Sequence, residues 1–342
     1  ITLGLVSTKF VHKTSGKTSG TRTHVDLGIS RTLSPKFPII STRANVGTTY
    51  YLLNNKSNIS RTTVGMGMDL AFPFKNQVTL FNSPTNHHLT PKISYNYRAK
   101  KVQGNIPIFD TTDKYDDIIT FADLTSGERY TGLDRITNAN DFTLSVESAH
   151  RKIDATEKDK DLLNIKIAQS YYTDDEVVSD SDNTDYETRR TYSDIAASID
   201  LSLDNFILGT AIQFDPDISK IVKKENSLSF KLNPKQFITL SYSDEGSKKT
   251  VKLYGAYPVN STIHLFGGID KTTSTGVINQ ETTGIAYESC CWAIRLAHFK
   301  EYNGSYSYST AFELVLKGLG SSSKPFKGRV ESNIPYYNAN YR

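Results

Sequence analysis

The stretch Val64-Gly65-Met66-Gly67-Met68-Asp69-Leu70-Ala71-Phe72 sets the pattern of the chain. Large apolar residues occupy every second position, and glycine, aspartate or alanine lies between them. Successive side chains of a β-strand point to opposite faces of a sheet, so a strand here has one apolar face and one small or polar face. The stretch therefore predicts a strand between an apolar and a polar environment.

The same alternation recurs along the whole chain. The 20 Tyr and 16 Phe, against 11 Pro and 2 Met, also favour strands. No segment has a convincing helical pattern, so we expect an all-β antiparallel chain of about sixteen strands. The expected strands lie at 1–12, 24–30, 43–52, 64–72, 89–98, 142–146, 163–171, 195–203, 206–214, 224–232, 238–242, 250–257, 263–269, 279–288, 292–298 and 312–316.

The connections between these strands alternate between tight and long. Because antiparallel strands run up and down, all tight turns then fall on one side of the sheet and all long loops on the other. This sorting is typical of an outer-membrane β-barrel, with periplasmic turns and extracellular loops. A soluble antiparallel sheet with one solvated face gives the same alternation of residues, but not the sorted loops. Tight turns are expected at 34–36, 204–205, 233–235, 258–260 and 288–289, and long loops at 13–20, 101–139, 174–190, 216–223, 244–249, 271–280 and 301–306.

Composition excludes several classes of protein. The net charge is +4, from 40 basic and 36 acidic residues, and no basic stripe suggests a nucleic-acid partner. No apolar run approaches the roughly 20 residues of a transmembrane helix, which leaves a transmembrane β-barrel open. The chain starts at Ile1 inside an alternating pattern, without an initiator Met or a signal peptide, so we interpret it as part of a larger precursor.

Charged and polar residues of the alternating segments are expected to face a polar lumen. A closed barrel of this kind leaves no backbone donor unpaired in hydrocarbon. We expect several of these side chains to pair with carboxylates of the lumen. The residues expected to face inward are Arg43, Lys92, Arg98, Lys166, Gln213, Lys252 and Arg295.

Motifs of catalysis and metal binding are missing from the sequence. His87-His88 is expected in a solvated turn, without a carboxylate or cysteine at ligand spacing. The run from Asp180 to Asp185 imitates the start of a calcium loop but lacks Gly at the sixth place and Glu at the twelfth. There is no nucleophile elbow or phosphate-binding glycine loop. We therefore expect a protein that is not an enzyme and that has no cofactor and no metal.

Cys290 and Cys291 are adjacent and are the only cysteines. Consecutive Cα atoms lie about 3.8 Å apart, whereas disulfides prefer roughly 4.4–6.8 Å. Any structural disulfide therefore needs a partner outside this chain. The alternative is two free thiols that act as small apolar residues.

Several motifs carry a family resemblance. The run from Tyr287 to Leu296, with its adjacent cysteines followed by Trp-Ala-Ile-Arg, closely resembles the LptD family of lipopolysaccharide-assembly outer-membrane proteins. The run 130–140 resembles the family's loop motif, carried here by Gly132, Asp134, Arg135 and Asn140. The run 312–319 resembles its last barrel strand, and 331–336 its C-terminal tail.

The resemblance implies a domain organisation. The family has a periplasmic jellyroll domain followed by a barrel of twenty-six strands, so this chain is expected to be the C-terminal portion of the barrel over residues 1–319, followed by a periplasmic C-terminal tail over 320–342. The resemblance also implies that Cys290 and Cys291 form disulfides with two cysteines of the missing N-terminal region.

The function implied by the resemblance is transport of lipopolysaccharide (LPS) to the outer leaflet of a Gram-negative outer membrane. LPS would arrive over a periplasmic bridge through the missing N-terminal domain and leave by a lateral gate between the first and last barrel strands. Implied partners also include the plug lipoprotein LptE and a Bam-type assembly machine during folding. One lip of the gate would be the last strand, with Thr310, Phe312, Leu314 and Leu316.

Two other classes of protein remain open. A sixteen-stranded general porin fits the strand count and would be a diffusion channel, but it gives no reason for adjacent cysteines at a periplasmic turn. A surface adhesin or an array of soluble β-sandwiches would have loops without sidedness.

Overall fold

The structure is a computed structural model that describes residues 1–12, 18–54, 56–153, 160–179, 185–233, 235–316, 320–321, 324–335 and 337. The described residues form two compact units. Unit 1 contains Ile1–Ser198 and Ile212–Ile221, and unit 2 contains Ile199–Ala211 and Val222–Arg342. The main sheet has 18 strands, and all the strand pairings given below are antiparallel.

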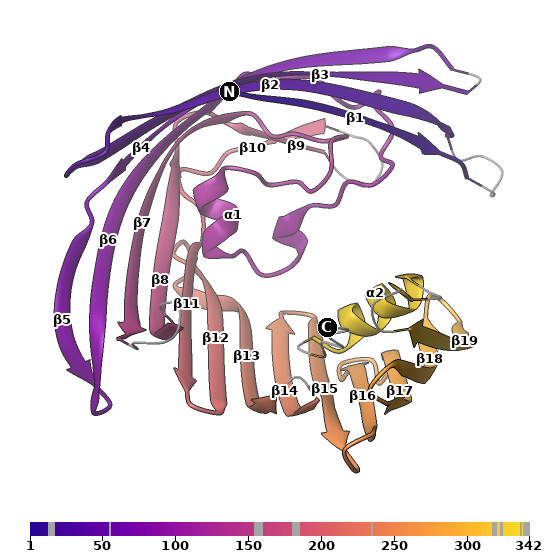
Figure 1. The fold of residues 1–342 in the computed structure, drawn as a ribbon. Helices are drawn as coiled ribbons and strands as arrows, with labels where there is room; N and C mark the ends of the chain where they lie inside the picture. The colour runs from indigo at the N-terminus through magenta and orange to yellow at the C-terminus, as the bar shows by residue number, and fades with distance from the viewer. Residues whose placement is uncertain are drawn as a thin grey trace. The chain divides into compact units, whose positions relative to one another are not determined.

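Unit 1 is a sheet in which β1, β2, β3, β4, β6, β7 and β8 pair in that order (Figure 1). The short strand β5 extends this sheet by pairing with β6 beyond the end of β4. The strands are β1 Thr2–Phe10, β2 Gly20–Ser34, β3 Ile39–Leu53, β4 Ile59–Ala71, β5 Phe74–Leu80, β6 Ser83–Arg98, β7 Ala139–Lys152 and β8 Lys160–Tyr172. A separate pair is formed by β9 (Glu176–Ser179) and β10 (Asp185–Thr188).

The strand register in unit 1 places apolar residues of neighbouring strands opposite one another, and small or polar residues likewise. Leu27 of β2 pairs with Val46 of β3, and Val46 pairs with Val64 of β4, which makes an apolar row on one face. One position along, Asn45 pairs with both Gly28 and Gly65 on the other face. A slip by one residue would exchange the two faces, so the alternation of the sequence specifies this register.

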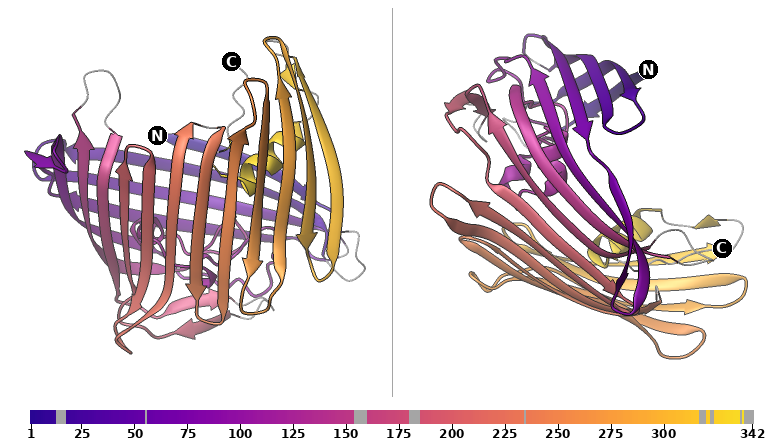
Figure 2. Two further views of the ribbon diagram at one scale, coloured as in Figure 1. Left: turned by 90° about the horizontal axis from the view of Figure 1, so that it is seen from below. Right: turned by 90° about the vertical axis from the view of Figure 1, so that its left-hand side faces the viewer.

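Unit 2 continues with β14 to β19, which lie side by side in chain order (Figure 2). The strands β11 (Ile195–Leu203), β12 (Phe206–Asp215) and β13 (Lys220–Asn233) have residues in both units. Unit 2 ends in the two-residue strand β20 (Gly320–Ser321) and in helix α2 (Lys324–Asn333). The other strands are β14 Gln236–Glu245, β15 Lys248–Pro258, β16 Ile263–Thr272, β17 Ile278–Glu288, β18 Trp292–Tyr302 and β19 Tyr306–Leu316.

The structure confirms the all-β antiparallel architecture and contains all sixteen expected strands. The sequence did not predict β5, β9, β10 and β20, which are all short. The expectation of no helix was wrong, because η1 (Lys114–Asp116), α1 (Phe121–Ser126) and α2 are helical. None of the described helices is long and apolar enough to cross a membrane.

The predicted sorting of loops holds only in unit 1. There the connection 99–138 joins β6 to β7, whereas 35–38 and 81–82 are short turns at the opposite strand ends. In unit 2 the expected long loops at 244–249 and 301–306 are tight hairpins, because β14 and β15 extend to Glu245 and Lys248, and β18 and β19 to Tyr302 and Tyr306. Charged residues at strand ends resembled loops, and for this reason the prediction was wrong.

Two further local expectations have different outcomes. His87 and His88 lie inside β6 and not in a turn, and the His87 ring stacks on His150 of β7 at 4.2 Å. We predicted a turn at His87-His88 because Asn86 and the two histidines interrupt the apolar alternation of the sequence. Most of the run from Asp180 to Asp185, with its calcium-loop likeness, lies outside the described residues.

Candidate functional site

On these strands large apolar side chains are exposed and polar side chains are buried, which is the reverse of a soluble protein. In β7 the side chain of Leu144 is 60% exposed, whereas the neighbouring Ser145 is 4% exposed. In β18 Ile294 and Leu296 are exposed, whereas Arg295 between them is 1% exposed. Large apolar residues are exposed in this way on strands of both units. Since soluble proteins rarely expose large continuous apolar surfaces, this face requires an apolar surrounding such as lipid.

The opposite, inner face carries the predicted charges, and most of them are paired. Arg43 binds Asp69 at 2.7 Å, Arg98 binds Glu128 at 2.5 Å, and Lys166, Lys252 and Arg295 lie within 3.7 Å of Glu147, Asp270 and Glu313, respectively. This confirms the expected pairing with carboxylates. Gln213 and Arg295 are buried, so these two inward residues do not lie in an open, water-filled lumen. Protein segments cover both residues.

One such segment is the connection 99–138 of unit 1, which contains η1 and α1 and lies against the inner face of the sheet (Figure 1). Thr120 caps α1 reciprocally with Asp123, and Gly127 ends it with φ +65°. Leu124 and Ile119 are buried with Ala168 and Ala196 of the sheet. The packing explains how six helical residues persist although so short a helix is unstable alone.

Asp134 of the predicted loop motif is the main polar anchor of this connection. Its side chain is 0% exposed and accepts hydrogen bonds from Arg22 (2.7 Å), from Tyr51 (3.2 Å) and from the backbone amides of Phe109 (2.8 Å) and Asp110 (3.1 Å). Arg22 and Tyr51 belong to β2 and β3. A carboxylate with so many donors is well compensated for its burial. It therefore ties the connection to the sheet.

Arg22 also binds Asp110 through two hydrogen bonds of 2.5 and 2.7 Å. These bonds hold the pKa of Asp110 below its ordinary value of 3.8. On the next strand, Arg61 donates to the backbone oxygens of Leu133 and Asp134 and to Gln103. Two arginines of the sheet thus hold the motif at Leu133 and Asp134.

The other predicted motif residues also have structural roles. Arg135 is buried and donates to the carbonyl oxygens of Asp134 (3.1 Å) and Ile106 (2.8 Å). Gly132 has φ +68°, and a Cβ there would lie 2.8 Å from Asp110 Oδ1 and Thr111 Oγ1. Only glycine adopts this conformation without strain and clash. The structure brings Gly132, Asp134 and Arg135 together in one fold of the connection.

Asn140, the fourth motif residue, lies apart from them at the start of β7. It accepts a hydrogen bond from Tyr95 (3.0 Å) and donates to Asp174 (2.9 Å). It therefore links β6 and β7 to the connection after β8.

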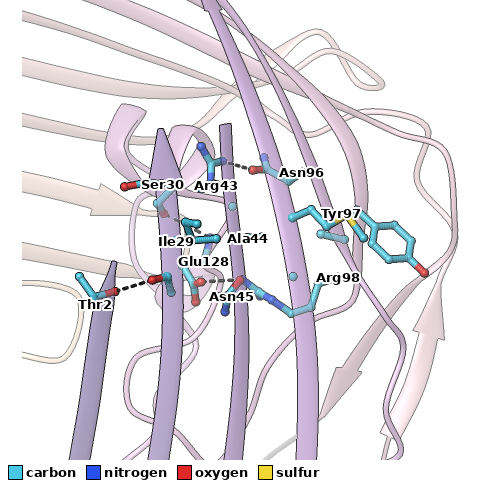
Figure 3. A pocket seen from close by; sticks show the side chains of 16 residues that line it. Thr2, Ile29, Ser30, Arg43, Ala44, Asn45, Asn96, Tyr97, Arg98 and Glu128 are labelled. Carbon is cyan, nitrogen blue, oxygen red and sulfur yellow. Dashed lines mark hydrogen bonds and ion pairs between the residues drawn. The ribbon is translucent and has the colours of Figure 1, made fainter. Parts of the chain in front are cut away.

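A polar cavity of about 350 Å³ lies between the inner face of unit 1 and residues 126–128 (Figure 3). Arg43 donates to Asn96, and Arg98 to Glu128, along its wall. Ser30 and Asn45 also line the cavity, next to Gly28 and Gly65, which have no side chains to fill the space, and Ile29, Ala44 and Met66 contribute apolar lining. The inner face is thus polar where the connection leaves it open.

In unit 2 the inner face is covered by α2 together with Ile334 and Tyr337 (Figures 1 and 2). Val330, Ile334 and Tyr337 are fully buried against Phe237, Phe266 and Phe299 of the sheet. Arg329 lies over the Phe299 ring at 4.0 Å and binds Glu301 at 2.7 Å. The predicted tail over 320–342 is thus seated on the sheet over its described part. Its predicted periplasmic location remains a prediction.

Beneath Tyr337, at the end of the described tail, lies a polar cluster of His264, Glu288 and Lys235. The hydroxyl of Tyr337 lies 2.6 Å from His264 Nε2, and burial raises the pKa of Tyr337, so the phenol stays protonated and can donate this bond. His264 Nε2 lies 3.9 Å from Glu288, which forms an ion pair with Lys235. Glu288 is the last residue of β17, two positions before Cys290.

Cys290 and Cys291 lie in the exposed turn between β17 and β18, with their sulfur atoms 2.7 Å apart. Ser289 closes the turn by donating its backbone amide to the carbonyl of Trp292 at 2.9 Å. The two thiols form no disulfide within the described residues. Both are accessible to a reagent or to another cysteine.

The predicted gate residues Thr310, Phe312, Leu314 and Leu316 all lie in β19, which begins earlier than the expected strand at 312–316. This strand pairs with β18 from end to end, and on its other edge β20 pairs only with Val315 and Leu316. Phe312, Leu314 and Leu316 are exposed on the apolar face. Residues 317–319 of the family-like run lie outside the described residues.

The anchoring residues Arg22, Tyr51, Asp110, His264 and Tyr337 were missed by sequence reasoning. Arg22 gives a faint signal, because it is the one arginine or lysine in the polar row of its strand. A stronger signal was available for the tail: Val330, Ile334 and Tyr337 have the i, i+4, i+7 spacing of an apolar helical face.

An apolar outer face, a polar inner face and an antiparallel sheet define a membrane-spanning β-sheet protein. The model of the family LptD, LPS transport system D, matches residues 1–267. The chain belongs to the LptD family, which places it in the outer membrane of a Gram-negative bacterium.

Relatives agree with this assignment. The LPS-assembly protein LptD of Shewanella sp. (strain ANA-3) is 28% identical over 352 residues, which cover 92% of this chain and 45% of the relative. That of Shewanella frigidimarina is 28% identical over 292 residues, which cover 78% and 37%, respectively. The chain thus spans less than half the length of these relatives.

Among solved structures, a mutant of Rh. blastica porin aligns with 91% of this chain and 95% of its own at 12% identity, with a TM-score of 0.38. A score of this size does not establish a shared overall structure.

Proposed function

We propose that this chain is part of an outer-membrane LPS transporter that inserts LPS into the outer leaflet through a lateral gate. The transporter receives LPS over a periplasmic bridge, through a domain that this chain does not contain. Acyl chains move into the membrane while the sugar chain crosses the polar lumen. The function needs no catalytic residue, which agrees with our prediction that the protein is not an enzyme.

The observation that carries the proposal is the edge of β19. Within the described residues, positions 306–312 of this strand have a strand pairing on one side only, with β18. Unpaired backbone groups are costly in lipid, so such an edge requires a partner strand. A partner that pairs weakly would allow LPS to pass sideways at this seam, next to Thr310, Phe312, Leu314 and Leu316.

Two observations outside β19 also support the proposed role in LPS transport. Exposed thiols at Cys290 and Cys291, in a turn, suit disulfides with cysteines outside this chain in an oxidising compartment. The lining of the polar cavity in Figure 3 suits hydrated sugars better than acyl chains. Other proposed partners are the plug lipoprotein LptE, near the connection 99–138, and a Bam-type machine that pairs with exposed strand edges during assembly.

The test uses the full-length protein in its own outer membrane, with a photoreactive residue in place of Phe312. Leu240 of β14 is the matched control, because it is also an exposed apolar residue but lies in a strand paired on both sides. After a short pulse of labelled LPS precursor and illumination, we expect adducts with newly made LPS at position 312 well before position 240.

Equal labelling of both positions at all times would contradict the gate. A protein without LPS adducts that makes liposomes permeable to small sugars would instead be a general porin.

A further inference from the structure

We propose that Tyr337 is a positioning residue for the cysteine turn: seating of the C-terminal segment on the sheet holds Cys290 and Cys291 where they can form their disulfides. The inference rests on the disulfides of the proposed function. Its basis is the contact between the end of the tail and the strand that leads into the turn.

The first step is the packing of the tail. Tyr337 is 2% exposed, and its ring stacks on Phe266 of β16 at 4.7 Å between ring centres. Ile334 and Val330 are completely buried beside it. Phe266 and His264 are neighbours on the inner face of the same strand. In its observed position Tyr337 therefore contacts both of them at once, the first through its ring and the second through its hydroxyl.

The second step is polar. Tyr337 Oη contacts His264 Nε2 at 2.6 Å, and this nitrogen lies 3.9 Å from Glu288 Oε1. The other carboxylate oxygen of Glu288 binds the ammonium of Lys235. His264 and Glu288 are 3% and 9% exposed, so removal of the Tyr337 hydroxyl leaves His264 buried without its closest polar partner.

The third step connects Glu288 to the turn. Its backbone amide donates to the carbonyl of Thr262 at 2.7 Å, and the next residue, Ser289, closes the turn on Trp292. The side chain and backbone of Glu288 are thus both held just before Cys290. With Tyr337 absent, His264 loses its close partner, and the strand end that carries the cysteines loses one of its supports.

The chemistry that this positioning serves is thiol–disulfide exchange with a cysteine disulfide elsewhere in the protein. The thiolate of Cys290 or Cys291, having given its proton to solvent, attacks one sulfur of that disulfide. One S–S bond forms, another breaks, and the displaced sulfur leaves as a thiolate, so no further oxidant is consumed. Such attack requires close approach, which a turn held in one position favours.

The experiment is a pulse–chase of the full-length protein in cells, with non-reducing electrophoresis of each time point. Tyr337→Phe removes the hydroxyl and keeps the ring, and Tyr337→Ala removes both. Tyr308→Ala is the matched control, because Tyr308 is an exposed tyrosine of the same unit. We expect both Tyr337 variants to form the long-range disulfides roughly tenfold more slowly, within the range by which misplaced groups slow a reaction, and Tyr308→Ala at the wild-type rate.

Heat-modifiable mobility of the folded barrel distinguishes positioning from misfolding, and we expect it to be unchanged in Tyr337→Phe. His264→Phe should slow the disulfides as much as Tyr337→Phe, and the double variant no more than either. Wild-type rates in Tyr337→Phe would overturn this inference alone. A wild-type protein without long-range disulfides would overturn both the inference and the proposed role of the cysteines.

Discussion

The two units cover the inner faces of similar sheets in different ways. In unit 1 the covering segment is the connection 99–138, which is fixed by Arg22, Asp110 and Asp134 through buried hydrogen bonds and ion pairs. In unit 2 it is the C-terminal segment, which is fixed chiefly by Val330, Ile334 and Tyr337 in an apolar cluster. The outer faces of both units expose apolar residues.

The difference shows that sheets with the same apolar outer face can be covered on their inner face by different segments, held by different kinds of contact. Lipid requires the same apolar alternation on every strand, whereas the inner face has to satisfy only the segment that lies on it. A charged anchor fails when one partner is lost, because the other remains buried without a counter-charge. An apolar anchor loses stability in proportion to the packing removed. The following changes separate the two kinds of anchor.

The largest effect is expected for Asp134→Ala in the full-length protein. The change leaves Arg22, Tyr51 and two backbone amides without their shared acceptor, and removing one member of a buried ion pair costs about 3–5 kcal/mol. Protease cleavage within 99–138, followed by mass spectrometry, should rise sharply while cleavage near α2 stays unchanged. Glu128→Ala, which breaks a partly exposed pair with Arg98, is the control and should have little effect.

Ile334→Ala tests the apolar anchor of unit 2. Truncation of a fully buried isoleucine costs about 2–5 kcal/mol. Release of the C-terminal segment by protease should increase, without any change in cleavage of 99–138. If both segments open together in this variant, the two anchors are coupled and the comparison fails.

Gly132→Ala should loosen unit 1 by a smaller amount. A residue with a side chain in the left-handed region costs about 1–2 kcal/mol, and here the added Cβ also meets Asp110 and Thr111. The measurement is again cleavage of 99–138, and Gly127→Ala is the control, since Gly127 has a similar φ of +65° in the same connection and its nearest neighbour is the side chain of Asn96 at 3.1 Å. Equal effects of the two changes would mean that the close contacts at Gly132 contribute nothing.

The smallest effect concerns pH. The pKa of Asp110 is lower in the folded protein than its ordinary value of 3.8, because Arg22 donates to it. Its contribution to stability is therefore fully present above that value and is lost as the pH falls through the lower folded pKa. Cleavage of 99–138 by an acid-active protease should rise as the pH falls below about 4, and Asp110→Asn should flatten this rise. An unchanged rise in Asp110→Asn would assign it to other carboxylates.

The strands were predictable because lipid on one side and polar groups on the other impose a period of two on every spanning segment. Strand ends were less predictable, since Glu245, Lys248 and Tyr302 lie where the sheet leaves the apolar layer and polar residues suit strand and loop equally. The anchors were the least predictable. Arg22 and Asp134 are 112 residues apart, and nothing local to either residue indicates the contact. The loop motif indicated Gly132, Asp134 and Arg135 but not their partners.

The most direct test of the two-faced sheet is lipid contact along one strand. A photoreactive residue is placed in turn at positions 142, 143, 144, 145 and 146 of β7 in the full-length protein, and lipid adducts are measured by mass spectrometry in outer-membrane vesicles. Our account predicts adducts at 142, 144 and 146, where Phe142, Leu144 and Val146 are exposed, and none at the buried Thr143 and Ser145. Adducts at all five positions, or at 143 and 145 alone, would contradict it.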